Sequence, residues 1–322
     1  MEFLWFLSSI RNPVFDFFFG LITYFGDEII FMAVAITLFW CVSKKDGYYI
    51  LTVGFIGTIL NQFLKLLFRI PRPWVLDESF KAVESAIEGA GGYSFPSGHT
   101  QSSVGTFGSI AHLYKNKAIR ILSIILCVLV PFSRMYLGVH TPLDVFVSLG
   151  IALALIFVLK PIFDKVYDST KGMLIFIGVM ALMALGFLLF VHLYPFENEV
   201  LSSDNYEHAL KNAYTLLGAL IGMAVALPLE RKFVNFETKD KWYIQIIKVV
   251  LGLILVLGTK ELSELALSPI FDGHPSLHAI RYFLVVLVAV FFYPMLFPLI
   301  RKLDEKNFNK KETEENAATQ AK

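Results

Sequence analysis

Long apolar runs separated by short polar segments make up most of the chain from residue 27 to residue 300. A helix needs about 20 apolar residues to cross the hydrocarbon core of a bilayer, and nine segments approach or exceed that length. The predicted spans are 27–43, 47–68, 98–114, 119–138, 141–160, 172–193, 211–229, 243–262 and 278–300. The pattern therefore predicts an all-α polytopic membrane helix bundle with about nine transmembrane helices.

The two ends of the chain differ from this pattern. Residues 1–26 are rich in aromatic side chains but are interrupted by Arg11, Asn12 and Asp16, which favours helices that lie in the membrane interface. The N-terminus lacks the basic region and small-residue cleavage site of a signal peptide, so we expect no cleaved leader. Residues 303–322 are polar and charged, which predicts a disordered cytoplasmic tail.

Composition agrees with a lipid environment. Hydrophobic residues make up 56% of the chain and charged residues 17%, whereas a soluble domain is about a quarter charged. The net charge of +1 gives no support for a nucleic-acid partner. Cys41 and Cys127 lie in or beside apolar runs and have no metal-site or redox spacing, so we expect both to act as small apolar residues.

Basic residues indicate how the bundle is oriented. Lys and Arg collect in cytoplasmic loops, and here they gather at alternate turns. The groups are Lys44 and Lys45; Lys115, Lys117 and Arg120; Lys160, Lys165 and Lys171; Arg231, Lys232, Lys239 and Lys241; and Arg301 and Lys302. This arrangement predicts a cytoplasmic C-terminus and an external N-terminus. The short loops and compact chain are typical of a bacterial cytoplasmic membrane protein.

Eight residues with phosphate chemistry lie at the ends of four successive predicted spans, all on the external side. They are Lys65 and Arg72 after the second span, Ser97, Gly98 and His99 at the start of the third, Arg134 at the end of the fourth, and His140 and Asp144 at the start of the fifth. Ionisable groups at this depth are costly and indicate function. We therefore expect one oxyanion pocket facing away from the cytosol.

Each of these residues has a chemical reason to be there. A phosphoryl group carries negative charge on three oxygens, and the cations Lys65, Arg72 and Arg134 suit it. Lys65 lies about two helical turns before Arg72, which predicts that both point the same way. The backbone N–H groups from Ser97 to His99 lie at the positive end of a helix, where Gly98 permits close approach.

Two histidines and a carboxylate complete the predicted site. His140 and Asp144 are spaced i,i+4, so that the carboxylate can accept from one ring nitrogen and leave the other free to attack phosphorus. His99 then remains as the acid that protonates the leaving oxygen. This chemistry needs no metal and no cofactor, and no carboxylate cluster in the sequence suggests a metal site.

Structural roles are the alternative for each residue taken alone. Lys65 and Arg72 could extend their charges to the interface. Thr141 and Asp144 match a capping box at a helix start, and a single histidine is more often interfacial than catalytic. The joint occurrence of all of them on one membrane face favours the functional interpretation.

The pattern resembles the three-part signature of the type 2 phosphatidate phosphatase superfamily, which is K-x6-R-P, then P-S-G-H, then S-R-x5-H-x3-D. Every fixed position is present, and the resemblance covers about residues 28–160. It implies a six-helix catalytic core, here within 27–170, with His140 as the nucleophile, Asp144 as its partner and His99 as the general acid. The phosphate cradle that it implies is Lys65, Arg72, Ser97, Gly98 and Arg134.

Residues 171–302 contain more predicted spans than this resemblance requires. The outer loop between the last two spans leads to His278 and Arg281, which are i,i+3 neighbours at the start of the final span. They are candidate contacts for a substrate headgroup. The alternative is an ordinary polar loop with an interfacial histidine and arginine.

The leading hypothesis is an enzyme that hydrolyses a lipid phosphate or lipid pyrophosphate at the extracytoplasmic face through a phosphohistidine. A phosphatase for small soluble phosphomonoesters and a lipid phosphotransferase remain as alternatives. A transporter is disfavoured because the ionisable groups gather at one face instead of at mid-bilayer. The expected partners are a lipid phosphate substrate and membrane lipid, and the oligomeric state is left open.

Overall fold

A computed structural model of the protein describes residues 1–201 and 203–302, and in this part of the chain every regular element is helical. The tail predicted for 303–322 lies outside the described residues. The α-helices are α1 (Glu2–Ser9), α2 (Pro13–Thr23), α3 (Glu28–Cys41), α4 (Lys44–Phe68), α5 (Pro73–Leu76), α6 (Glu84–Ile87), α7 (Gly98–Ser103), α8 (Ser109–Leu113), α9 (Lys117–Tyr136), α10 (Pro142–Val166), α11 (Thr170–Leu193), α12 (Asn198–Leu201), α13 (Asp204–Leu229), α14 (Trp242–Phe271) and α15 (Leu277–Leu287).

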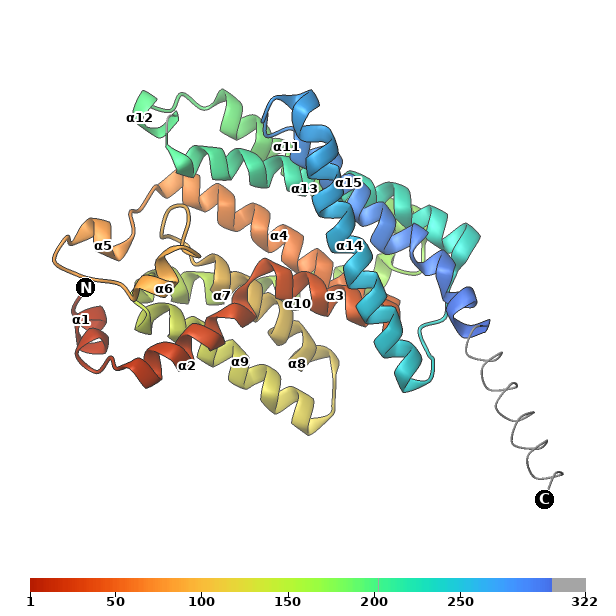
Figure 1. The fold of residues 1–322 in the computed structure, drawn as a ribbon, viewed down its shortest axis with the longest axis horizontal. Helices are drawn as coiled ribbons and strands as arrows, with labels where there is room; N and C mark the ends of the chain where they lie inside the picture. The colour runs from red at the N-terminus through yellow and green to blue at the C-terminus, as the bar shows by residue number, and fades with distance from the viewer. Residues whose placement is uncertain (202, 303–322) are drawn as a thin grey trace, which may run out of the picture.

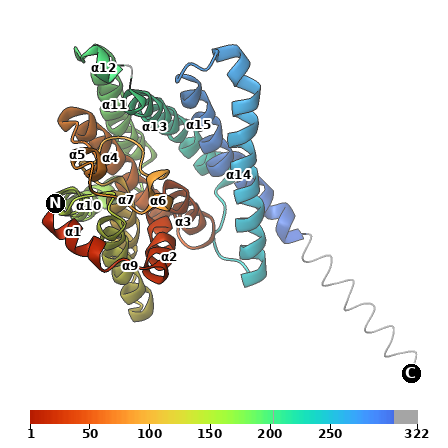
Figure 2. The same ribbon diagram turned by 60° about the vertical axis from the view of Figure 1, so that its left-hand side comes forward.

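Helix α4 lies between two groups of helices. On one side it packs against α3, α7 and α10, and on the other against α11 and α13. Figures 1 and 2 show α1 to α10 gathered on one side of the molecule and α11, α13, α14 and α15 on the other. The short helices α5 and α6 and the N-terminus lie together at one end of the bundle, far from residue 302 (Figure 1).

Within the described residues, seven helices are long and apolar enough to cross a membrane, and an eighth crossing is possible if α2 and α3 act together across a 52° bend. The seven confirm seven of the nine predicted spans and establish the polytopic helix bundle. The predicted span 27–43 corresponds to α3, which has only 14 residues. Helices α1 and α2 confirm that residues 1–26 are mainly helical, and their place in the interface stays a prediction.

The remaining predicted span, 98–114, is a continuous helix from Gly98 to Leu113 that includes a π-helical turn at Val104–Gly108. Its 16 residues rise only about 24 Å, less than the thickness of a bilayer core. At its far end the Tyr114 hydroxyl donates to Asp46 Oδ2 over 3.0 Å, beside the first turn of α4. The helix is therefore short because its N-terminus, at Gly98, is recessed into the bundle.

Basic residues meet at the end of the bundle opposite to this recess. Lys44 Nζ lies 2.6 Å from Glu230 Oε1, and Lys45 Nζ lies 2.8 Å from Asp164 Oδ1. Arg301 Nε donates to Asp240 Oδ1 over 2.6 Å. The first two contacts join the start of α4 to the ends of α13 and α10, and the third joins the last helix to the loop before α14.

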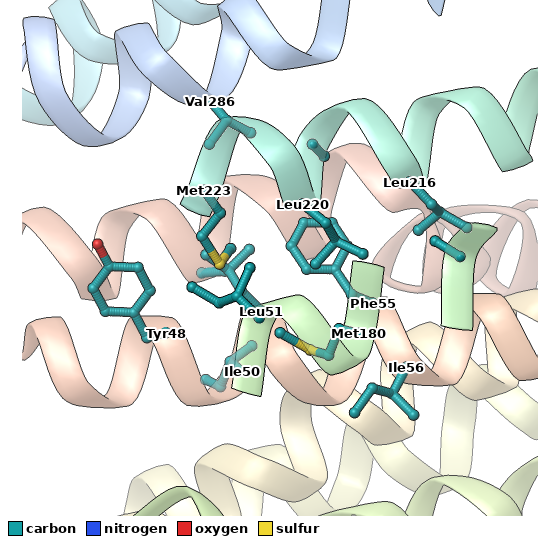
Figure 3. Close-up of a cluster of buried hydrophobic side chains, with 14 of the residues drawn as sticks. Tyr48, Ile50, Leu51, Phe55, Ile56, Met180, Leu216, Leu220, Met223 and Val286 are labelled. Atoms are coloured by element: carbon teal, nitrogen blue, oxygen red, sulfur yellow. The ribbon is translucent and has the colours of Figure 1, made fainter. Parts of the chain in front are cut away.

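The largest buried cluster lies between the two groups of helices. Figure 3 shows side chains of α4 meeting those of α11, α13 and α15, with Leu51 and Phe55 facing Met180, Leu220 and Met223. Many other large apolar side chains are exposed on the outer surface. Such a surface suits a protein whose solvent is lipid, where helices associate through close packing instead of water exclusion.

Small residues bring α13 and α15 into close contact. Gly218 and Gly222 form a Gly-x-x-x-Gly pair on α13, a spacing that lets helix backbones approach in membranes. A Cβ added at Gly218 would lie 2.0 Å from the Ala279 carbonyl oxygen, and one added at Gly222 would lie 2.9 Å from the Phe283 carbonyl oxygen. Neither position has room for a side chain without movement of the backbone opposite.

We therefore expect Gly218→Ala to destabilise the protein by about 1–3 kcal/mol, the usual cost of overpacking. Thermal unfolding in detergent measures this as a lower Tm. Gly178→Ala is the matched control, because an added Cβ on that α11 residue meets nothing within 4 Å. Equal Tm values for the two variants would contradict the close approach of α13 and α15.

Candidate active site

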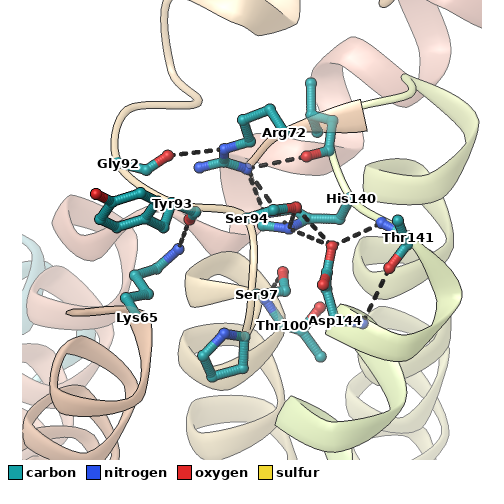
Figure 4. A network of polar contacts seen from close by, with 12 residues as sticks. Lys65, Arg72, Gly92, Tyr93, Ser94, Ser97, Thr100, His140, Thr141 and Asp144 are labelled. Carbon is teal, nitrogen blue, oxygen red and sulfur yellow. Dashed lines mark hydrogen bonds and ion pairs between the residues drawn. The ribbon is translucent and has the colours of Figure 1, made fainter. Parts of the chain in front are cut away.

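His140 lies in the short connection between α9 and α10, at the recessed end of the bundle. Its side chain is almost fully buried, with 1% exposed. Residues from the end of α4, from the loop before α7 and from the start of α10 surround it (Figure 4). The segments that the sequence predicted to converge are thus brought to one place.

Arg72 and Asp144 both lie beside the imidazole of His140. Arg72 Nη1 lies 2.9 Å from Nε2 and 3.5 Å from Nδ1, and these similar distances place the guanidinium nitrogen over the face of the ring. Nδ1 lies 3.4 Å from Asp144 Oδ2. A ring that carries its proton on Nδ1 would therefore be supported by this carboxylate and would leave Nε2 unprotonated.

Asp144 is the helix cap that the sequence offered as one alternative, and its carboxylate also lies beside His140. Its Oδ2 accepts from the Thr141 backbone N–H over 2.7 Å, and the Thr141 hydroxyl accepts from the Asp144 backbone, which completes a capping box at the start of α10. The same Oδ2 accepts from the Ser94 hydroxyl over 2.6 Å. The cap thus fixes the carboxylate in the position from which it faces His140.

The two cations predicted near the end of α4 are held by backbone carbonyls. Arg72 donates to the carbonyls of Gly91, Gly92 and Val139 at 2.7, 3.0 and 2.9 Å. Lys65 Nζ donates to the Tyr93 carbonyl. The loop 91–93 therefore orients both side chains from the same side, as Figure 4 shows.

The reason given for aligning Lys65 with Arg72 was wrong. Helix α4 ends at Phe68, and Arg69 adopts a left-handed conformation with φ 52°. Arg72 follows in extended backbone at the N-cap of α5. The two cations reach one site because the chain turns back after α4, not because they share a helical face.

Arg134 is the third buried cation, with 1% of its side chain exposed. Its Nη1 donates to the Thr23 hydroxyl over 2.7 Å, while Nε and Nη2 have no partner. Its carbonyl accepts from the backbone N–H groups of Val139 and His140, which ties the end of α9 to the loop that carries His140. Free donors on a buried guanidinium are costly and favour an anion as the missing partner.

The surroundings of His140 favour the neutral form of its imidazole. Burial lowers the pKa of His140 well below 6.5, and the positive charges of Arg72 and Arg134 lower it further. A depressed pKa keeps the imidazole neutral at ordinary pH. His140 therefore has its Nε2 lone pair available under the conditions in which phosphate esters are ionised.

Ser97, Gly98 and His99 form the first turn of α7. Ser97 is the N-cap, and its hydroxyl accepts from Thr100 N over 3.3 Å. Its own N–H donates to the Asp144 carbonyl over 3.1 Å, which links α7 to α10. His99 Nε2 lies 2.8 Å from Asp27 Oδ1, so the second histidine also has a carboxylate partner.

His99 borders two cavities of different character. One, of about 480 Å³, contains Arg134 together with Thr23 and apolar residues of α2 such as Phe17 and Leu21. The other, of about 250 Å³, is lined by residues of α3, α4 and α7. His99 thus has space for a ligand on both sides.

His278 and Arg281 lie elsewhere. Arg281 donates to the Lys260 carbonyl over 3.0 Å and pairs with Glu264. His278 Nδ1 lies 3.5 Å from Arg281 Nη1. Neither residue is among those that line the two cavities beside His99, and their contact with a headgroup stays a prediction.

Comparison with family models and with known proteins shows the family of this chain. The model of the PAP2 superfamily matches residues 47–168, and that of the transmembrane extension of PAP2 superfamily phosphatases matches residues 214–306. The chain is 31% identical over 175 residues to undecaprenyl-diphosphatase BcrC of Bacillus subtilis, which covers 50% of this chain and 86% of that protein. The chain belongs to the PAP2 superfamily.

Two other relatives carry related names. Phosphatidylglycerophosphatase B of Bacillus subtilis is 31% identical over 138 residues, covering 40% of this chain and 64% of that protein. Lipid A 4'-phosphatase of Bacteroides thetaiotaomicron is 23% identical over 154 residues, covering 44% and 67%. No solved structure matches the chain. Membership in the PAP2 superfamily makes the protein a hydrolase of phosphate esters or diphosphates and confirms the resemblance recognised in its motifs.

Three polar partners in this PAP2 site were missed by sequence reasoning. Asp27, Thr23 and Ser94 contact His99, Arg134 and Asp144 respectively. Asp27 and Thr23 precede the PAP2 match. An acidic residue at the start of an apolar run was the available signal for Asp27, whereas a serine or threonine in a loop carries no such signal.

The capping role of Asp144 and its predicted catalytic role can be separated by two variants. Asp144→Asn keeps an oxygen for the cap but loses the charge that supports Nδ1–H, and we expect phosphate release to fall by about 10³–10⁴-fold, as for triad carboxylates. Thr141→Ala removes a cap worth about 1 kcal/mol and should keep most activity. The measurement is phosphate release by purified protein in detergent. Equal losses in the two variants would mean that Asp144 only caps α10.

Proposed function

We propose that the protein hydrolyses a lipid phosphate or lipid diphosphate at the extracytoplasmic face, through a phosphohistidine intermediate on His140. One observation supports this most strongly: Nε2 of a buried, neutral His140 lies 2.9 Å from Arg72 Nη1, while Nδ1 lies beside Asp144. Replacing the contact between Arg72 and the ring with one between Arg72 and a phosphate oxygen would place phosphorus beside Nε2.

The first step transfers the phosphoryl group. Nε2 of His140 attacks phosphorus, a nitrogen–phosphorus bond forms and the bond from phosphorus to the leaving oxygen breaks. Protonated His99 gives its proton to that oxygen. Asp144 stabilises the positive charge that develops on the ring of His140, and the three buried cations stabilise the charge on the phosphoryl oxygens.

The second step regenerates the enzyme. His99, now neutral, takes a proton from a water molecule whose oxygen attacks phosphorus, and the nitrogen–phosphorus bond breaks. Inorganic phosphate leaves, His140 is neutral again, and His99 is protonated for the next cycle. Asp27 Oδ1 lies 2.8 Å from His99 Nε2 and orients the ring for both proton transfers.

Three considerations support a lipid as the substrate. The relatives named above act, by their names, on lipid phosphates or diphosphates. The site lies at the recessed end of a membrane bundle, where a headgroup can enter while its chains stay in the bilayer. The larger cavity beside His99 also combines Arg134 with the apolar side chains Phe17 and Leu21, a lining that suits an amphiphile.

The charge distribution supports the proposed sidedness. His140 lies near the end of α4 that carries Lys65, whereas the ion pairs of Lys44 and Lys45 lie at its beginning. Along α4, the rise from Lys44 to Lys65 is about 32 Å. Basic loops face the cytoplasm, so the site opens on the opposite face, and a bacterial cytoplasmic membrane is the setting that we propose.

The nucleophile is tested by His140→Ala. We expect this variant to fold, because it removes a side chain from a loop, and to lose phosphate release by at least about 10³-fold. Brief incubation of wild-type protein with a ³²P-labelled lipid phosphate should label it in an acid-labile, alkali-stable form that is missing in the variant. His112→Ala, near the far end of the helix from Gly98 to Leu113, is the control and should keep both properties. A labelled His140→Ala protein would rule out this residue as the phosphoryl carrier.

The proposed cradle consists of protein cations alone, so magnesium and chelators should have little effect. We expect kcat/KM in detergent to change less than about twofold between excess EDTA and millimolar Mg²⁺. The substrate for this measurement should be a monophosphate lipid below its critical micelle concentration, so that the ions do not alter its aggregation. Activity lost in EDTA and restored by Mg²⁺ would contradict the mechanism.

A further inference from the structure

A further cavity, of about 350 Å³, lies between α3, α14 and α15, which are neighbours in the bundle (Figure 2). Most of its lining is apolar, and polar side chains enter it at Glu28, Lys260 and Tyr282. A lining of this kind accepts a hydrocarbon. We call this cavity the apolar groove, and its apolar lining residues are Ile29, Met32, Ala33, Ile36, Leu253, Val256, Leu257 and Val285.

The apolar groove is elongated, because it follows two helices. Its residues on α3 begin at Glu28 and end at Ile36, over which the helix rises about 12 Å. Their spacing of three and four residues places them on one face of α3. Ile29 and Leu257, on the two opposite walls, are 63% and 45% exposed. The groove is therefore open along its side, so that a chain can enter it from the bilayer.

Close packing ends the groove on its inner side. Trp40 lies one turn beyond Ile36 on α3, and its Nε1 donates to the Ala289 carbonyl of the last helix over 2.8 Å. Gly252 precedes Leu253 on α14, and a Cβ added there would lie 2.3 Å from Trp40 Cζ3. The three helices therefore touch at this level and separate only above it, which gives the groove a defined length.

The other end of the groove lies next to the candidate active site. Glu28, the first residue of α3, lines both the apolar groove and the smaller cavity beside His99. Its neighbour Asp27 lies 2.8 Å from His99 Nε2. Phe31 lines the smaller cavity from a different face of α3 than Met32 presents to the groove. The two cavities thus lie on different faces of α3 and meet at Glu28.

The proposed mechanism requires such a continuation. His99 protonates the leaving oxygen, so the part of the substrate attached to that oxygen must extend into a space that His99 borders. The smaller cavity is such a space, and its surface is mainly apolar. Beyond Glu28 this path leads into the apolar groove, whose elongated shape and aliphatic walls match a hydrocarbon chain.

We infer that the apolar groove binds a hydrocarbon chain of the substrate, so that α14 and α15 supply a chain-binding site to the phosphatase. The inference rests on the proposed function and assigns a role to helices outside the motifs. Both helices lie in residues 214–306, which match the transmembrane extension of PAP2 superfamily phosphatases. The larger cavity, which contains Arg134, then holds the phosphate end of the substrate.

Hexyl phosphate and decyl phosphate test this, because they carry the same phosphate and differ only in chain length. The measurement is the ratio of kcat/KM for decyl phosphate to kcat/KM for hexyl phosphate in detergent. Ala33→Trp fills the groove from α3, and we expect it to lower this ratio by about 10-fold, since one buried methylene group is worth up to about fourfold in binding. Partition of the substrates into detergent is the same for every variant, so a changed ratio reports the groove.

Ala266→Trp is the matched control. It makes the same substitution at an exposed alanine of α14 that is not among the residues lining the groove, and the ratio should stay at the wild-type value. Leu257→Trp narrows the groove from α14 at a position that is 45% exposed. It should also lower the ratio, and it gives the answer if Ala33→Trp fails to fold, which a lower Tm in detergent reveals.

The outcomes separate the inference from the function on which it rests. A ratio that folded Ala33→Trp and Leu257→Trp leave unchanged would overturn the chain-binding site and leave the phosphatase intact. Equal losses for the two substrates belong to this outcome, because they would mean that the groove holds a membrane lipid that supports the fold. Failure of the wild type to release phosphate from decyl phosphate and from phosphatidate would overturn the proposed function and the chain-binding site together.

Discussion

Three cations are buried around one imidazole, and the rest of the site is arranged to make that possible. Moving a charge out of water costs several kcal/mol unless polar groups compensate for it. The carbonyls of Gly91, Gly92, Tyr93 and Val139 supply this compensation for Lys65 and Arg72. They are neutral acceptors, so they stabilise the cations without neutralising them, and the positive field remains available to a phosphoryl group. A carboxylate in the same place would have cancelled it.

The bundle provides the depth that this arrangement needs. The helix that starts at Gly98 is shorter than α4 on one side and α10 on the other, so that its positive end opens into a recess instead of into water. Backbone N–H groups and cations act more strongly there than at a surface, because the low dielectric screens them less. The same recess removes water from His140, which is the main cause of its lowered pKa. The short helix, the buried cations and the neutral form of His140 are thus consequences of one geometric feature.

Features of the fold and site that depend on local sequence patterns could be predicted, whereas those that depend on contacts between distant segments could not. Apolar runs predicted nine spans, and seven of them are long apolar helices in the described part of the chain, because the need to satisfy the backbone in lipid leaves few alternatives. Motif spacing led to Lys65, Arg72, Arg134, His140 and Asp144. Motif spacing did not reveal the turn after Phe68 that carries Arg72 back over the site. Nothing in the sequence indicates that Arg69 adopts a left-handed conformation. Nor did it identify Ser94 or Thr23, whose roles arise only from contacts across the bundle.

The contact between Asp27 and His99 brings to the site a carboxylate that lies outside the three motifs. Asp27 precedes the segment that the PAP2 superfamily match covers, and it reaches His99 because Gly26 packs against α7 so closely that an added Cβ would lie 2.8 Å from His99 Cβ. His99 is thus oriented from the N-terminal helices, and Asn212 of α13 also lines the cavity beside it. Two segments outside the recognised motifs therefore border the histidine to which the proposed mechanism assigns the leaving oxygen. If that mechanism holds, elements that the motifs do not contain are in position to influence which substrate is accepted.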